Sequence, residues 1–231
     1  NTTSPLLRQH TTTMPTHTTN VETLTSPALG STCALTASQQ THLATDRDNS
    51  LRWLTVFQST FRHRPYLLEV RDNATNSLGH LPLCLIESRL FGRFLVSLPY
   101  LNTAGVCTPL PVVADQLIDR AVELANDLNV QHLELRHEHE FPSPHFNDSM
   151  KEKVHMRLDL PAESNILWKQ LKPKVRNQIR KGDSHNLTIK WGRHQNLRDF
   201  YRVFSRNMRD LGTPVYSRAL FQNILDQFPS A

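Results

Sequence analysis

The sequence predicts a mixed α+β fold, in which helices pack on a layer of mixed strands. Segments with apolar residues at helical spacing alternate irregularly with short apolar segments typical of strands. Their order is helix, strands, helix, strand, strand, then strand, helix, helix, which differs from a regular βαβ series. Apolar residues make up 38% and charged residues 20% of the 231 residues, so the chain has enough apolar side chains for a core.

Composition divides the chain into a tail and three structured parts. Residues 1–45 are rich in Thr, with Ser, Pro and His, and poor in large apolar residues. Such a segment buries too little apolar surface to offset the entropy of ordering, so we expect disorder there. The structured parts are residues 46–160, the helical residues 161–185, and residues 186–231.

The part at 46–160 is predicted to contain two helices and five strands. Asp48 or Ser50 is a suitable N-cap for the first helix, whose apolar residues recur at helical spacing. Gly92 separates two apolar segments and indicates a hairpin or two neighbouring strands. The predicted elements are a helix up to Phe61, a strand at 66–71, two strands within 80–98, a helix over 117–128, and strands at 132–136 and 154–160.

The rest of the chain is predicted to be mostly helical. Leu171, Val175 and Ile179 form an apolar stripe that we expect to be buried. Pro173 interrupts this pattern, which predicts a kink or two helices end to end. The predicted elements are helical residues from Ser164 to Gly182, a strand at 187–191, a helix over 197–211 ended by Gly212 and Pro214, and a helix after Ser217.

Bulk properties narrow the class of protein. A net charge of +5 favours an anionic ligand such as a phosphate, a nucleotide or RNA, although a merely basic surface explains it equally well. Cys33, Cys84 and Cys107 show no CxxC spacing, which argues against a disulfide framework or a zinc cluster and fits a reducing compartment. The chain has no apolar run of the roughly 20 residues that span a bilayer and no apolar signal-peptide segment. We therefore expect a cytoplasmic protein without a transmembrane segment.

Four stretches of the chain from Ser97 onward are distinctive. They are SLPYLNTAGV at 97–106, HLELRH at 132–137, LKPKVRNQIRKGDSHNLTIKWG at 171–192 and FYRVFSRNMRDLGTPVYSRALF at 200–221. In order and spacing they resemble the FemAB family of the GNAT superfamily, most closely the FemAB-like proteins associated with PEP-CTERM/exosortase systems. The two long stretches are the most specific. The resemblance covers residues 50–231, and the tail has no counterpart in it.

This resemblance implies two tandem GNAT-like domains that share a continuous mixed sheet surface. Residues 46–160 would be the first domain, residues 161–185 a connecting basic helix, and residues 186–231 the start of the second. The implied activity is transfer of an acyl or aminoacyl group to an amine, with acyl-CoA or aminoacyl-tRNA as co-substrate and no permanently bound cofactor. The implied acceptor is a small molecule or a cell-envelope or exopolysaccharide precursor.

The resemblance also places the acyl-donor groove in strands beyond Ala231. Because the chain begins with Asn1 rather than Met and ends just after an amphipathic helix, we expect a fragment that lacks part of the catalytic centre. The catalytic residues, the choice of donor and the oligomeric state are therefore left open.

The basic helix is the first candidate binding site. Cations at every fourth residue project from one surface, and arginine binds phosphate in a bidentate way. Cations near a helix C-terminus are also favoured by the helix dipole, which is a purely structural explanation. The resemblance favours a role beside the donor or acceptor cleft. The candidate residues are Lys172, Lys174, Arg176, Asn177, Arg180 and Lys181.

Two further segments are candidates for substrate contact. Tyr100 and Asn102 lie in a loop that follows a strand and contains Gly105, which permits close approach of a ligand. Arg206, Asn207 and Arg209 lie on the polar face of a helix. The resemblance implies that this helix walls the acceptor site, whereas a solvated helix face with a C-cap is the alternative.

Other chemistries find little support in the sequence. The RHEHE segment at 136–140 offers possible metal ligands, but its two histidines alternate sides in a strand and no third ligand is evident, so no metal is predicted. Cys84 and Cys107 have no neighbouring His in the sequence, so we expect direct attack of the amine without a covalent enzyme intermediate. The alternatives are a noncatalytic RNA- or phosphate-binding module that uses the basic helix, and a degenerate GNAT scaffold that acts through protein contacts.

Overall fold

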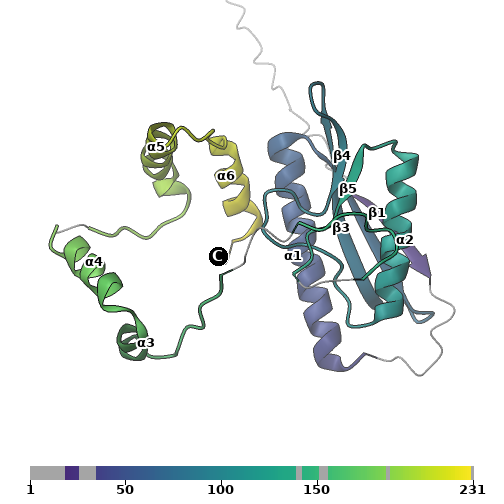
Figure 1. Cartoon of the computed structure of the whole chain (residues 1–231), viewed down its shortest axis with the longest axis horizontal. Coiled ribbons are helices and arrows are strands. Elements are labelled where there is room, and N and C mark those ends of the chain that lie inside the picture. The colour runs from purple at the N-terminus through teal and green to yellow at the C-terminus, as the bar shows by residue number, and fades with distance from the viewer. Residues whose placement is uncertain (1–18, 26–34, 139–141, 151–155, 186–187, 230–231) are drawn as a thin grey trace, which may run out of the picture. The chain divides into compact units, whose positions relative to one another are not determined.

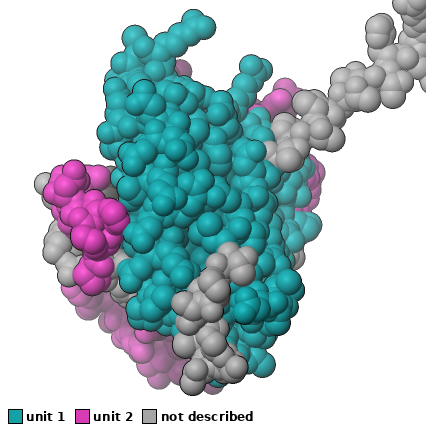
Figure 2. Space-filling view, turned by 90° about the vertical axis from the view of Figure 1, so that its right-hand side faces the viewer, with its two compact units in different colours: residues 1–141, 226–230 teal, residues 142–225, 231 magenta. Residues whose placement is uncertain are grey.

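The described residues contain one five-stranded sheet and six helices, which confirms the predicted mixed α+β architecture. They belong to two compact units, coloured separately in Figure 2: unit 1 comprises residues 1–141 and 226–230, and unit 2 comprises residues 142–225 and 231. No helix in the described part of the chain has both the length and the apolarity to cross a membrane. The computed structural model describes residues 19–25, 35–138, 142–150, 156–185 and 188–229.

Unit 1 is built on a mixed sheet whose strands lie in chain order. The central strands β2, β3 and β4 pair antiparallel, whereas β1 pairs parallel with β2 and β5 pairs parallel with β4. A tight turn joins β2 to β3, because the Asp72 carboxylate accepts hydrogen bonds from the backbone N–H groups of Ala74 and Asn76. The strands are β1 (Asn20–Thr25), β2 (Arg64–Arg71), β3 (Ser77–Ser88), β4 (Gly92–Val96) and β5 (His132–Glu134).

Two helices, α1 (Ala37–Phe61) and α2 (Pro111–Asp127), cover opposite faces of this sheet (Figure 1). Successive side chains of a strand point to opposite faces, so each strand contributes to two packed layers. Leu68, Leu81 and Leu117 meet in the apolar layer beneath α2. Pro111 begins α2, where its missing N–H costs no intrahelical hydrogen bond.

The layer beneath α1 is more polar. Glu69 and His80 are fully buried, although both can carry charge. Glu69 forms ion pairs with Arg47 of α1 at 3.0 Å and with Arg71 at 2.9 Å. Burial raises the pKa of Glu69, but hydrogen bonds from Arg71 and Ser77 and the charges of both arginines bring the pKa below its ordinary value of 4.5. The buried carboxylate is therefore ionised and paired on both sides.

Unit 2 contains helices and irregular segments in its described residues. Pro173 begins α4 directly after α3 has ended, which confirms the prediction of two helices end to end. The rings of Phe204 and Phe221 join α5 to α6, with centroids 5.1 Å apart, and Leu197 and Leu220 are buried. The helices are α3 (Ser164–Gln170), α4 (Pro173–Asp183), α5 (His194–Asp210) and α6 (Arg218–Gln227), and the last two residues of α6 are counted with unit 1.

The prediction that residues 1–45 are disordered is wrong for the described parts of this segment. The whole of β1 pairs with β2, and α1 begins at Ala37, well before its predicted start. Thr36 and Gln39 form a capping box, in which each side chain accepts a hydrogen bond from the other's backbone N–H. Leu43 packs in the core of unit 1, so tertiary contacts stabilise a segment that its composition alone does not.

Two predicted strands are not formed in the residues that the structure describes. Residues 156–160 and 188–191 have no strand structure, and the remainder of each predicted strand lies outside the described residues. Ile189 and Trp191 are exposed, at 77% and 92%. An extended apolar segment becomes a strand only when a neighbouring strand satisfies its backbone groups, and none does so here among the described residues.

The apolar layer beneath α2 can be tested by truncating one of its buried side chains. We expect Leu117→Ala to lower the free energy of unfolding by about 2–5 kcal/mol, because Leu117 is fully buried. Urea denaturation of the full chain measures the change. Val112→Ala is the matched control, since Val112 lies on the same helix at 52% exposure, and it should cost less than about 0.5 kcal/mol. Equal losses from the two variants would contradict the packing described for α2.

Candidate functional site

Strand pairing along β3 is interrupted where residues 97–106 form a loop. The strand β4 pairs with β3 as far as Val96. The chain returns to β3 at Cys107, whose backbone N–H donates to the His80 carbonyl at 2.9 Å and whose carbonyl accepts from the His80 N–H at 3.1 Å. In an unbroken ladder His80 would face Tyr100 instead. The interruption therefore places Cys107, and not Tyr100, opposite His80.

Arg136, which follows β5, holds this loop in place. Its backbone N–H donates to Ser97 Oγ at 2.8 Å, and its Nη1 donates to the Leu101 carbonyl at 2.8 Å. Its own carbonyl accepts a hydrogen bond from the Ala104 N–H at 2.8 Å. Glu134 fixes the guanidinium through an ion pair of 2.7 Å between Oε1 and Nε. The Glu134 carboxylate therefore stabilises the loop through Arg136, and we do not assign it the role of accepting a substrate proton.

Gly105 allows a side chain to approach the loop backbone closely. A Cβ atom at this position would lie 2.3 Å from Cδ2 of His137. The close approach expected at Gly105 is therefore filled by His137, at least in part. Burial lowers the pKa of His137 below its ordinary value of 6.5, so this ring is neutral near pH 7.

Tyr100 lies in the loop with a strained backbone and a well-packed ring. Its φ of 72° is in the left-handed region, which is unusual for a non-glycine residue and is found most often where surrounding contacts enforce it. The ring lies 4.5 Å from Phe61 and 5.5 Å from Phe57, between centroids, and His63 stacks on it at 5.9 Å. Tyr100 is nevertheless 41% exposed, so its ring is anchored and still accessible to a ligand.

The Tyr100 hydroxyl forms a hydrogen-bonded pair with His63. The hydroxyl oxygen lies 2.8 Å from His63 Nε2, and the direction of the hydrogen bond depends on the tautomer of the ring. Burial lowers the pKa of His63 below 6.5, so the imidazole is neutral near pH 7. A neutral imidazole has one N–H donor and one lone pair, so the pair can take a proton from a ligand or give one to it.

The predicted site residues are divided between the two units. Tyr100 and Asn102 belong to unit 1, and both are exposed. The predicted residues of the basic helix and of α5 belong to unit 2. The structure therefore places Tyr100 beside His63, which the sequence did not indicate. Asn102 lies in the same loop as Tyr100, whereas the predicted residues of unit 2 lie on or next to α4 and on α5.

The predicted basic helix is present as α4. Its cations form no ion pair with an acidic side chain in the part of the chain that the structure describes. Arg180 lies over the Trp168 ring, with its guanidinium carbon 5.4 Å from the centroid, and donates to Asn177 Oδ1 at 3.2 Å. The cations are Lys172, which precedes the helix, Lys174, Arg176, and Arg180 and Lys181 in the last turn, where they also favour the helix dipole.

The predicted burial of the apolar stripe on this helix is wrong. Val175 and Ile179 are 39% and 40% exposed, and α4 has no buried residue. Helical spacing shows which side chains share a face, but a second element must cover that face before they are buried. In unit 2 the apolar stripe of α4 is accessible, and so are its cations apart from Arg176, which is half-buried.

The α5 candidates border two shallow hollows. The first, of about 570 Å³, includes Arg206 and Asn207, and the second, of about 630 Å³, includes Arg206 and Arg209. Arg209 also forms an ion pair with Asp210 at 3.2 Å. The side chains around the hollows are Arg202, Val203, Ser205, Arg206, Asn207, Arg209, Asp210 and Val215.

Two residues that shape the unit 1 site, His63 and Arg136, were not predicted from the sequence. His63 follows Arg62, the left-handed residue that caps α1, and no spacing pattern connects His63 with Tyr100. Arg136 lies in the HLELRH stretch that carries part of the family resemblance, but its contacts with the loop depend on the pairing of β4 with β5. Tertiary structure brings His63 to Tyr100 and Arg136 to the loop that carries Tyr100.

The lowered pKa of His63 predicts how stability depends on pH. The unfolded chain takes up a proton near pH 6.5, whereas the folded chain resists protonation of His63, so the free energy of unfolding should fall as the pH drops below about 6.5. The pKa of His137 is lowered as well, so His137 also makes the free energy of unfolding fall as the pH drops. His63→Gln should flatten this dependence, and NMR titration should give a His63 midpoint below 6.5. A midpoint at or above that value would contradict the burial of the ring.

The comparison with known proteins gives no family assignment. No protein-family model, curated protein or solved structure matches the chain significantly. The resemblance to the FemAB family therefore stays a prediction, and function has to be inferred from the chemistry of the described residues.

Proposed function

We propose that this chain takes part in acyl transfer to an amine in the cytoplasm, on a GNAT-like acyltransferase fold. The observation that carries the proposal is the Tyr100–His63 pair, in which the hydroxyl of a 41% exposed tyrosine lies 2.8 Å from a neutral imidazole. The left-handed backbone at Tyr100 supports a functional role for this loop. The stretches that resemble the FemAB family, one of which contains Tyr100, indicate the reaction class.

In the proposed reaction, the nitrogen of a neutral amine attacks the carbonyl carbon of a thioester or an aminoacyl ester. A C–N bond forms and a C–S or C–O bond breaks, so one proton must pass from the nitrogen to the leaving sulfur or oxygen. Tyr100 accepts the amine proton as it passes its own to His63 Nε2, and the reverse transfer delivers a proton to the leaving atom. Tyr100 is the catalytic residue in this scheme, and His63 acts through it.

The cysteines do not compete with this direct attack. Burial raises the pKa of Cys84 to about 12, and burial together with the charge of Asp46 raises the pKa of Cys107 to about 12. Both are therefore protonated thiols near pH 7, and a protonated thiol is a poor nucleophile. A mechanism without a covalent enzyme intermediate fits this state of the thiols.

The cations of α4 supply the second part of the proposal. Both expected donors, acyl-CoA and aminoacyl-tRNA, are rich in phosphate. Because these lysines and arginines have no acidic partner among the described residues, they can bind phosphate without first breaking an ion pair there. We assign α4 to donor binding and the α5 residues Arg206, Asn207 and Arg209 to acceptor contact.

A second function, an RNA- or phosphate-binding module without catalysis, is favoured by the contact between Arg180 and Trp168. A guanidinium and an aromatic plane held together are typical of surfaces that bind single-stranded nucleic acid. Such a module would bind RNA with steep salt dependence and show no turnover. A degenerate scaffold that acts through protein contacts would show neither RNA binding nor transfer.

The Tyr100–His63 pair is tested by transfer of a labelled acyl group, with charged tRNA and acyl-CoA offered side by side. We expect Tyr100→Phe to lower the rate by about a hundredfold or more, because general acid–base catalysis contributes roughly 10²–10⁴-fold. Phe91→Ala is the control, since Phe91 is an exposed aromatic residue in the β3–β4 turn. An unchanged rate for Tyr100→Phe would remove the pair from the mechanism. Transfer from neither donor by the folded full-length protein would favour the binding module.

The role of α4 is tested with Arg176→Ala/Arg180→Ala. We expect this variant to stay folded, to bind charged tRNA or acyl-CoA more weakly, and to lose transfer. In a plot of log affinity for tRNA against log salt concentration, the slope should become shallower by about one for each phosphate that the variant no longer binds. Arg89→Ala/Arg198→Ala removes the same charge from other exposed positions and should retain binding. Equal affinity in the two double variants would exclude α4 as the phosphate site.

A further inference from the structure

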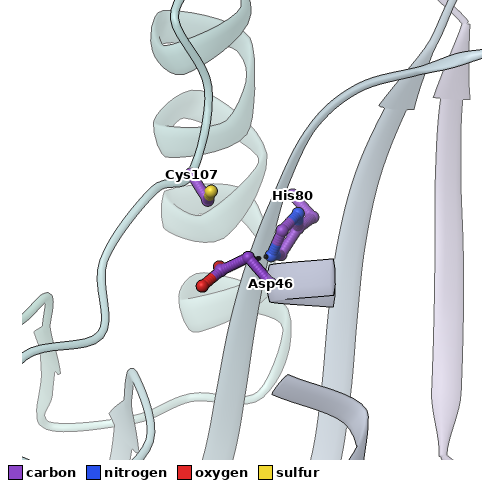
Figure 3. Close-up of side chains that lie close together, drawn as sticks. All are labelled: Asp46, His80 and Cys107. Atoms are coloured by element: carbon purple, nitrogen blue, oxygen red, sulfur yellow. Dashed lines mark hydrogen bonds and ion pairs between the residues drawn. The ribbon is translucent and has the colours of Figure 1, made fainter. Parts of the chain in front are cut away.

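Asp46, His80 and Cys107 meet in the polar layer beneath α1, well separated in sequence. Asp46 comes from α1, His80 from β3, and Cys107 from the point at which the chain returns to β3 (Figure 3). One potential ligand atom of each residue lies within 4.8 Å of those of the other two. No His is next to Cys107 in the sequence, but the backbone bridge between Cys107 and His80 sets these two residues side by side in the fold.

The three side chains are held by rigid parts of unit 1. His80 is fully buried, and two backbone hydrogen bonds fix Cys107 to it. Asp46 lies in α1 between the buried residues Leu43 and Ser50, which anchor the helix on both sides of it. The backbone positions of Asp46 and His80 are therefore set by a helix and a central strand.

The electrostatics of the cluster are those of an anionic site. The hydrogen bond from His80 is the main cause that lowers the pKa of Asp46 below 3.8, with a hydrogen bond from Cys107 adding to it, so Asp46 is ionised at neutral pH. The thiol of Cys107, by contrast, stays protonated because of burial and the neighbouring Asp46 charge. A divalent cation would reverse the electrostatic part of this effect and favour the thiolate.

One ring nitrogen of His80 has no partner that the structure describes. Nε2 lies 3.2 Å from Asp46 Oδ2, whereas Nδ1 is buried without a hydrogen bond among the described residues. The two nitrogens of an imidazole point in divergent directions, so an ion bound between Nε2 and Asp46 would leave Nδ1 outside the site. We therefore base the proposed site on the proximity of the three ligand atoms.

We propose that Asp46, His80 and Cys107 form a Zn²⁺ site in unit 1. One sulfur, one nitrogen and one oxygen are the ligand types that Zn²⁺ takes, and three protein ligands leave a fourth position for water. Bond lengths of about 2.0–2.3 Å place the ligand atoms of a tetrahedral site roughly 3.3–3.8 Å apart, so the cluster must contract by about 1 Å. Binding replaces the S–H bond of Cys107 with an S–Zn bond and releases that proton to solvent.

The site is distinct from the Tyr100–His63 pair, and it neither needs nor supplies a step of the proposed acyl transfer. Cys107 directly follows the loop at 97–106, which carries Tyr100. A metal bound to Cys107 would therefore restrain one end of this loop.

The experiment titrates the full-length, metal-stripped chain with Co²⁺ and then displaces Co²⁺ with Zn²⁺. A cobalt–thiolate bond gives a charge-transfer absorption that oxygen and nitrogen ligands do not produce. We expect this absorption in the unmodified chain and its loss in Cys107→Ser. Asp46→Asn keeps the shape of the side chain and should weaken Zn²⁺ binding by more than about a hundredfold. Mutating a residue that only supports a metal ligand already lowers metal affinity by roughly 10–100-fold, and a lost ligand should cost more.

Cys84→Ala is the matched control, because Cys84 is the other described free cysteine and lies outside the cluster. It should keep the absorption. Zn²⁺ should also raise the unfolding temperature of the unmodified chain, and Asp46→Asn should abolish this increase while its circular dichroism stays that of a folded protein. The proposal is overturned if the folded chain gives no thiolate absorption, or if Cys107→Ser retains it.

Discussion

The antiparallel pairing of β2 with β3 is the interaction on which the rest of unit 1 depends. Because alternate side chains of these strands point to opposite faces, the pair supplies two layers of different chemistry. Leu68 and Leu81 go to the apolar layer with α2, whereas their neighbours Glu69 and His80 go to the polar layer beneath α1. A shift of this register by one residue would exchange the layers and bury charges against leucines.

The break in pairing beside β3 connects this architecture to both proposed sites. The loop at 97–106 carries Tyr100 out of the sheet to His63, and its return places Cys107 beside His80. A continuous strand would present alternating side chains at a fixed spacing, and neither cluster would form. Arg136 and Glu134 stabilise the loop through hydrogen bonds that a purely apolar loop would lack, so the interruption is a built feature of the fold.

The helices of unit 2 are explained by local sequence signals more than by burial. Its helices begin and end close to where local patterns indicate, since Pro173 separates α3 from α4 and Gly212 follows α5 with a positive φ. Few of its side chains are buried, and its cations on α4 have no acidic partner among the described residues. Such a surface is suited to an anionic ligand, and donor binding and RNA binding both use that property.

The sequence by itself determined the elements whose signals are local: the mixed architecture, the strands at 66–71 and within 80–98, the helix α2 and the basic helix. Apolar spacing, capping residues and Pro or Gly positions act over a few residues, so these elements are visible without a fold. Only the tertiary structure decided whether a pattern is used. Within the polar residues 1–45, tertiary contacts stabilise β1 and the start of α1. Residues 188–191 form no strand. Tertiary structure also brings His63 to Tyr100 and Asp46 to Cys107. Burial, strand pairing and contacts between distant side chains depend on the closure of the whole chain, which no local pattern encodes.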